Sequence, residues 1–143
     1  MADKNYKSFT GKRKEAVARL RLFVTGLPTV IGDDVKKGDI LVNGKKAEEY
    51  FKGLVAKATY EEPFKITNTL GKYTFTLKIT GGGTKSQLEA FIHAVSKALS
   101  SLDEKSKHIL KKKGFLTRDA RVRERRKVGM GGKSRRKRQS PKR

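Results

Sequence analysis

The alternation of apolar and polar residues predicts two main strands. Between residues 15 and 25, every second residue is small or aliphatic, and Arg19 and Arg21 fall between them. A period of two is typical of a strand that buries one face, so we expect the other face of this strand to be basic and exposed. Residues 73–79 alternate in the same way, with threonines and Lys78 between the apolar positions. Three glycines at 81–83 end this second strand, because glycine weakens strand packing.

Apolar residues spaced three or four apart predict the helices. Residues 45–60 show this spacing and predict one broken helix or two short helices, with the break at Gly53. The most regular apolar stripe begins near Thr84 and predicts a long helix that lies across the sheet. A shorter helix at 103–113 has a basic outer face and ends before Gly114, which suits a C-cap.

The other segments predict short strands and turns. Residues 39–42 and 64–66 have the composition of short strands, and Asn43–Gly44 is a strong tight-turn dipeptide. Residues 27–38 contain glycine, proline and aspartate and predict an extended loop. The length of 143 residues allows one folded domain with a modest core.

The composition excludes several classes of protein. The chain has no cysteine, which removes disulfide frameworks, zinc ribbons, thiolate nucleophiles and iron–sulfur clusters and suits a reducing compartment. The first residues lack the apolar region of a signal peptide, and no apolar run is long enough to span a bilayer. We therefore expect a cytoplasmic protein with no membrane partner.

The charge of the chain indicates a polyanionic partner. Lys and Arg number 36 against 14 acidic residues, which gives a formal charge of +22, and such a charge repels itself unless a polyanion neutralises it. The excess is concentrated near the C-terminus, where residues 105–143 hold 18 basic and 2 acidic residues. Residues 121–143 have too few apolar side chains to offset the entropy of ordering, so we expect them to be disordered in the free protein.

The dense basic clusters are candidate RNA contacts. They lack the mixed signs of an ordinary solvated surface, and arginine predominates after residue 118. Planar guanidinium groups suit bidentate phosphate contacts and stacking on exposed bases, so nucleic acid is the favoured ligand. The candidate RNA-binding residues are Lys12, Arg13, Lys14, Arg19, Arg21, Arg118, Arg121, Arg123, Arg125, Arg126, Lys127, Arg135, Arg136, Lys137 and Arg138.

No arrangement of residues predicts catalysis, and we expect neither a cofactor, nor a metal ion, nor a small-molecule substrate. His93 and His108 have no partner at metal-ligand spacing, and His93 is interpreted as a residue on the flank of its helix. The adjacent glutamates Glu48–Glu49 and Glu61–Glu62 point apart in a helix and are interpreted as local charge balance.

Two glycine-containing motifs invite a phosphate-binding interpretation. Gly132–Lys133–Ser134 lacks the glycine and the strand that precede a phosphate-binding loop, since Lys127 stands where that glycine is required. Residues 81–83 lie between a strand and a helix, where backbone amides can hold a phosphate. A turn that permits close packing explains the three glycines equally well.

Several motifs occur in the order typical of one family. They are Phe9-Thr10-Gly11-Lys12-Arg13-Lys14, Ala16-Val17-Ala18-Arg19, Val42-Asn43-Gly44, Glu48-Glu49-Tyr50-Phe51, Gly81-Gly82-Gly83, Gly114-Phe115-Leu116-Thr117-Arg118-Asp119-Ala120-Arg121 and Glu124-Arg125-Arg126-Lys127. Together they closely resemble small-subunit ribosomal protein nine of the bacterial type, over nearly the whole chain.

The resemblance implies a fold and a set of partners. The implied fold is α+β, a two-layer α/β sandwich similar to the second domain of ribosomal protein five, with a long basic C-terminal extension. The implied partners are 16S-type rRNA of the small-subunit head, neighbouring head proteins and peptidyl-site tRNA. By this resemblance the basic clusters bind rRNA, and Lys142 and Arg143 at the end of the tail contact tRNA.

We therefore predict a non-enzymatic scaffold of the small ribosomal subunit. Residues 1–117 form a globular RNA-binding domain, and residues 118–143 form an extended basic tail. An alternative is a free nucleic-acid-condensing or regulatory protein, because residues 134–138 are also typical of a nuclear-localisation run. An enzyme of the general fold shared with some kinases is a third, more distant alternative.

Overall fold

A computed structural model describes residues 6–24, 35–125 and 128 of the chain. Its elements are β1 (Tyr6–Arg13), β2 (Ala16–Phe23), β3 (Ile40–Val42), β4 (Lys45–Lys46), α1 (Ala47–Tyr50), α2 (Leu54–Ile66), β5 (Thr74–Thr80), α3 (Thr84–Ser100) and α4 (Glu104–Lys112). The strands form one sheet in the order β1-β2-β5-β3-β4. Within that sheet only β3 and β5 are parallel.

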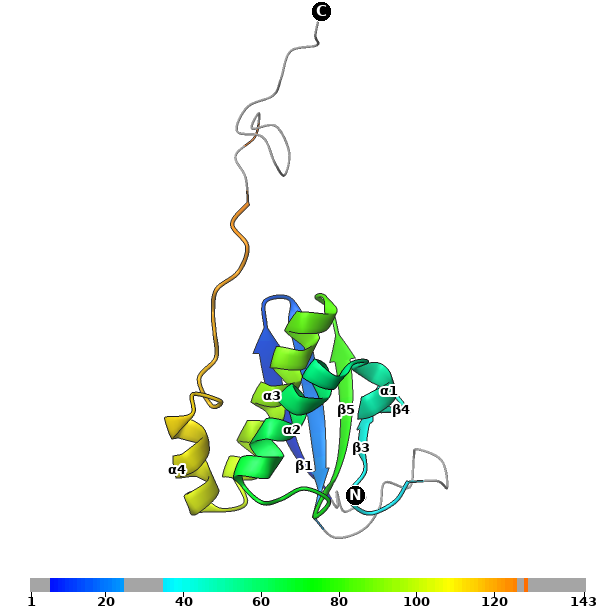
Figure 1. Ribbon diagram of the computed structural model, residues 1–143. Coiled ribbons are helices and arrows are strands. Elements are labelled where there is room, and N and C mark those ends of the chain that lie inside the picture. Colours follow the sequence, from blue (N-terminus) through cyan, green and yellow to red (C-terminus); the bar gives the residue numbers. More distant parts are fainter. Residues whose placement is uncertain (1–5, 25–34, 126–127, 129–143) are drawn as a thin grey trace, which may run out of the picture.

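The helices make a second layer on one face of the sheet, as Figure 1 shows for α2 and α3. Helix α3 packs on β1 and β2, while α2 and α4 pack on α3. The core lies between the layers and contains a cluster of aromatic rings, in which Phe91 lies 5.7 Å from Phe51 and 5.9 Å from Tyr60 between ring centroids. The fold is therefore mixed α+β, and its two layers agree with the predicted sandwich.

Strand β1 was not predicted, because its sequence does not alternate. It forms a hairpin with β2 across its whole length, from Tyr6 opposite Phe23 to Arg13 opposite Ala16. Gly11 explains how α3 can lie directly on this strand: a Cβ at Gly11 would stand 2.1 Å from the carbonyl oxygen of Ala90. The long helix thus packs backbone against backbone on a strand whose side chains carry little apolar pattern.

Most of the other predicted elements are confirmed. The strand over 15–25, the strand over 73–79, the helix from Thr84 and the helix near 103–113 correspond to β2, β5, α3 and α4. Gly53 separates α1 from α2 with φ of 105°, and Asn43–Gly44 makes the turn between β3 and β4 with both φ angles positive. Gly114 follows α4 with φ of 81°, a left-handed conformation typical of a C-cap glycine.

The strand predicted at 64–66 is wrong, because these residues form the last turn of α2. Phe64 is 1% exposed and its ring packs 5.3 Å from that of Phe75. An apolar side chain reaches the core from a strand or a helix alike, and three residues are too few to show a period. The loop predicted over 27–38 falls mostly outside the described residues. Among the described helices, none is long and apolar enough to cross a membrane.

Candidate nucleic-acid interface

The face of the sheet opposite the helices carries a basic and hydroxyl-rich surface. Residues of β1, β2 and β5 alternate between the core and this surface, and α2 and α3 lie on the other side of the sheet (Figure 1). A shallow hollow runs over it, and none of the residues that line the hollow is acidic. We call this surface the open sheet face; its exposed residues are Ser8, Thr10, Arg19, Arg21, Lys78 and Thr80.

Strand register places two cations side by side on the open sheet face. Arg19 pairs across β2 and β5 with Lys78, and Thr10 of β1 pairs with Arg19 from the other side. Like charges directly opposite each other in a sheet are destabilising. Neither cation makes an ion pair with a described residue. The arrangement therefore suits an anion that binds from outside the domain.

One end of the open sheet face carries aromatic rings. Arg21 lies over the ring of Tyr6, with its guanidinium carbon 5.0 Å from the ring centroid, and Tyr6 packs 5.6 Å from Phe23. This cation–π contact holds the Arg21 side chain along the strand. The guanidinium thus stays near the sheet surface, where its donors can reach a bound phosphate.

Arg13 has a different environment from its neighbours Lys12 and Lys14. Its side chain is only 12% exposed and forms ion pairs with Glu89 of α3 and with Asp119, where the Arg13 Nη2 to Asp119 Oδ2 distance is 3.0 Å. Its Nη1 also donates to the carbonyl oxygen of Arg121 at 2.8 Å. Arg13 therefore fastens the beginning of the C-terminal segment to the β1–β2 hairpin and to α3. We call this set of contacts the Arg13 clasp.

Asp119 completes the clasp from the side of the C-terminal segment. Its carboxylate accepts hydrogen bonds from the backbone amide of Arg121 at 2.9 Å and from the Arg121 guanidinium at 2.7 to 3.1 Å. These hydrogen bonds from Arg121, with the positive charge of Arg13, hold the pKa of Asp119 well below its usual range. The carboxylate is therefore charged at any physiological pH, and the clasp does not open by protonation.

His93 lies beside the clasp on α3, as expected for a residue on the helix flank. The backbone amide of Lys12 donates to its Nδ1 at 3.3 Å. Burial lowers the pKa of His93, and the positive charges of Lys97 and Arg118 act in the same direction. His93 is thus a neutral packing residue between the hairpin and the C-terminal segment at physiological pH.

The structure places the remaining predicted residues on two surfaces. Lys12 and Lys14 are exposed at the β1–β2 turn, and Arg118, Arg121, Arg123 and Arg125 are exposed on the segment that runs away from the domain after α4 (Figure 1). The clasp brings the turn and this segment together. The predicted residues Arg126, Lys127, Arg135, Arg136, Lys137, Arg138, Lys142 and Arg143 lie outside the described residues.

Lys78 is a member of the open sheet face that sequence reasoning missed. Its alternation with Thr74 and Thr76 was visible in the sequence. Its position beside Arg19 depends on the pairing of β5 with β2. The alternation of residues within one strand does not predict which strand lies beside it.

Packing explains two of the three glycines at 81–83. Gly81 and Gly82 have φ of 75° and 63°, and a Cβ on Gly81 would stand 2.4 Å from the carbonyl oxygen of Glu15. The turn thus lies against the β1–β2 hairpin at a distance that only glycine permits. In the described part of the chain, no group of three or more His, Asp or Glu side chains is placed to hold a metal ion.

These features define a class: a small, strongly basic α+β protein with a cationic sheet face opposite α2 and α3 and an anchored basic C-terminal segment. A family model described as ribosomal protein S9/S16 matches residues 11–143. The chain therefore belongs to the ribosomal protein S9/S16 family, as the sequence motifs predicted, and it is a ribosomal protein.

The sequence similarity to curated relatives extends over most of each chain and supports this assignment. The chain is 41% identical to the small ribosomal subunit protein uS9 of Maridesulfovibrio salexigens, over 90% of this chain and 91% of the relative. It is 42% identical to the protein of the same name from Desulfosudis oleivorans, over 86% of each chain, and 41% identical to that of an Anaeromyxobacter species, over 85% of each.

Proposed function

We propose that this protein, a structural constituent of the small ribosomal subunit in the cytoplasm, binds 16S-type rRNA of the subunit head. The observation that carries the proposal is the pair of cations Arg19 and Lys78, which stand side by side on the open sheet face with no acidic neighbour in the hollow above them. The names of the relatives, which are proteins of the small ribosomal subunit, support the same reading.

The open sheet face offers two kinds of contact to RNA. Arg19, Arg21 and Lys78 supply positive charge for phosphates, and the guanidinium groups can bind phosphate oxygens in pairs. The hydroxyls of Ser8, Thr10 and Thr80 can exchange hydrogen bonds with phosphates and with ribose 2′-hydroxyls, which is how proteins recognise folded RNA by shape. The predicted contacts of the exposed Lys12 and Lys14 extend this surface at the hairpin turn.

The C-terminal segment supplies a second set of contacts in this proposal. Its predicted rRNA-binding residues begin at Arg118, next to the Arg13 clasp, so the clasp fixes where the segment leaves the domain. Phe115 and Leu116 still pack against the core, which supports the proposed domain boundary after residue 117. Lys142 and Arg143, at the end of the segment, are proposed to contact peptidyl-site tRNA.

Membership of the family supports a non-enzymatic role and a set of macromolecular partners. The protein acts as a scaffold and not as an enzyme, and its partners are rRNA, tRNA and neighbouring proteins of the subunit head. The likeness of the fold to the second domain of ribosomal protein five remains a prediction, which the arrangement of one sheet and one helical layer supports.

Two experiments test the proposal. Tagged protein in a cell extract is separated on a sucrose gradient: it should sediment with small subunits, and recovery only in the free protein fractions would contradict the proposal. Removal of Lys142 and Arg143 should weaken tRNA binding to the peptidyl site of purified small subunits while the subunits still assemble. Unchanged tRNA binding would leave the rRNA role in place and remove the tRNA contact.

A further inference from the structure

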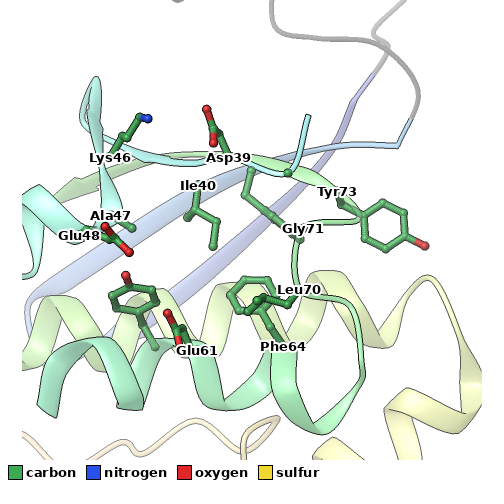
Figure 2. A pocket seen from close by; sticks show the side chains of 13 residues that line it. Asp39, Ile40, Lys46, Ala47, Glu48, Glu61, Phe64, Leu70, Gly71 and Tyr73 are labelled. Carbon is green, nitrogen blue, oxygen red and sulfur yellow. The ribbon is translucent and has the colours of Figure 1, made fainter. Parts of the chain in front are cut away.

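A groove opens between α2 and the end of the sheet, away from the open sheet face. It has a volume of about 320 Å³ and an apolar floor that includes Ile40, Phe64 and Phe75. In Figure 2, Ile40 points from the sheet toward α2, and Glu48 of α1 and Glu61 of α2 approach the groove from opposite walls. We call this site the α2 groove.

Tyr60 of α2 contributes a hydroxyl group to the lining of the groove. Its side chain lines the α2 groove and is 3% exposed, and its hydroxyl makes no hydrogen bond to a described residue. Burial raises the pKa of Tyr60, and the negative charges of Glu48 and Glu61 raise it further. The hydroxyl therefore lies within electrostatic reach of two carboxylates, and it is accessible from the groove, where an entering group can form a hydrogen bond with it.

The charge around the α2 groove contrasts with the rest of the chain. The charged residues that line the groove are three acids, Asp39, Glu48 and Glu61, and one base, Lys46, whereas the whole chain carries +22. Lys57 pairs with Glu48, and Lys65 pairs with Glu61 at 2.9 Å, which orients both carboxylates. No ion pair of the described residues uses Glu48 Oε2. This surface therefore has no excess positive charge with which to attract RNA phosphates.

The rim of the α2 groove also exposes an apolar side chain. Leu70 lines the groove and is 56% exposed, in the loop that connects α2 to β5. An apolar floor, an exposed apolar rim and two carboxylates match a long side chain that has an aliphatic stem and a cationic end. Lysine and arginine have this form.

We propose that the α2 groove binds a lysine or arginine side chain from an extended basic segment of a neighbouring protein in the same ribosomal subunit. The stem packs on Ile40, Phe64 and Leu70, and the cation binds Glu48, Glu61 and the hydroxyl of Tyr60. The inference rests on the proposed function, since the neighbour is supplied by the assembled subunit. It assigns protein recognition to the helical side of the domain and RNA recognition to the open sheet face.

Photo-crosslinking in isolated small subunits tests the inference. The photoreactive residue p-benzoylphenylalanine replaces Leu70 in one variant and the exposed Thr80 of the open sheet face in another. We expect the probe at 70 to link to a Lys- and Arg-rich segment of a neighbouring protein, mapped by mass spectrometry, and the probe at 80 to link to rRNA. A link from position 70 to RNA, or none at all, overturns the inference even when position 80 links to rRNA.

Matched charge variants decide whether the groove makes the contact. In the background of the probe at 70, Glu48→Gln with Glu61→Gln should lower the crosslink yield at least fivefold, and Tyr60→Phe should lower it about twofold. Glu49→Gln with Glu62→Gln removes the same charge from neighbouring positions that do not line the groove, and it should leave the yield unchanged. Equal loss in the two double variants overturns the inference. Absence of the protein from small subunits would overturn the inference and the proposed function together.

Discussion

Arg13, at the end of β1, and Asp119, beyond α4, form an ion pair with Nη2 3.0 Å from Oδ2. The same guanidinium holds Glu89 of α3 and the backbone carbonyl of Arg121. One side chain thus joins the hairpin, the long helix and the start of the C-terminal segment. A residue in a basic motif therefore has a positioning role within the domain, in addition to the RNA contact predicted from its sequence.

Replacement of the clasp residue should loosen the C-terminal segment without unfolding the domain. In Arg13→Met, the carbonyl oxygen of Arg121 loses its hydrogen bond and Asp119 loses its ion pair with residue 13. We therefore expect faster motion of the backbone at 121 and at the following residue 123 on the picosecond-to-nanosecond timescale. Heteronuclear ¹⁵N relaxation of the full chain measures this motion. Lys14→Met, at the exposed hairpin turn, is the control and should change nothing. Rigid amides at 121 and 123 in Arg13→Met would show that the clasp does not hold the segment.

The free protein should become more stable when one cation of the open sheet face is removed. Lys78→Gln relieves repulsion with Arg19, and cross-strand like-charge pairs are worth about 0.2 to 1 kcal/mol. Urea unfolding at low salt should therefore show a higher free energy of unfolding than wild type, and the gain should shrink at high salt. Lys72→Gln, outside the open sheet face, is the control. A destabilised Lys78→Gln would mean that the lysine has a stabilising partner in the free domain.

Close packing of α3 on β1 should make Gly11 intolerant of a side chain. Gly11→Ala places a Cβ 2.1 Å from the carbonyl oxygen of Ala90 and 2.5 Å from the amide of Ala94, so we expect a loss of about 2 to 3 kcal/mol of stability. Gly83→Ala, whose Cβ meets no atom within 4 Å, should lose less than about 1 kcal/mol. Thermal or urea unfolding compares the two, and equal losses would contradict the packing seen here.

The neutral His93 predicts a pH dependence of stability. Its pKa is lowered in the folded protein, so below about pH 6.5 the unfolded chain binds a proton that the folded chain does not. The contribution of His93 is therefore complete above that pH and is lost as pH falls toward the folded-state value. His93→Gln should flatten the fall in unfolding free energy between pH 7 and 5. An equally steep profile in His93→Gln would assign the dependence to other groups.

The elements that the sequence predicted share a strong local period. Apolar residues alternate with polar ones in β2 and β5 and recur every three or four residues in α3, with few exceptions. This period alone indicates whether the segment is a strand or a helix. β1 escaped prediction because Lys7, Ser8, Thr10 and Lys12 leave it no apolar face of its own; it is held by pairing with β2 and by Gly11 against α3. The misplaced strand at 64–66 had too few residues to reveal a period.

The candidate interface was predictable in composition but not in arrangement. Arg19 and Arg21 were expected on an exposed strand face, and that expectation is confirmed. The presence of Lys78 on the same face and the inward position of Arg13 depend on contacts between segments far apart in the sequence. The number of charged residues does not predict these contacts. The sequence around a basic residue is the same whether its side chain faces solvent or pairs with a carboxylate.

The salt dependence of RNA affinity tests the central claim most directly. Binding of the full chain to a 16S-type rRNA fragment of the subunit head is measured over a range of salt, for wild type and for Arg19→Gln with Lys78→Gln. If each cation contacts one phosphate, the slope of log affinity against log salt should fall by roughly 1.4 to 1.8. Lys52→Gln with Lys72→Gln removes the same charge elsewhere on the exposed surface and should leave the slope nearly unchanged. Equal changes in the two double variants would contradict the claim, because they would show that net charge alone, and not the open sheet face, binds the RNA.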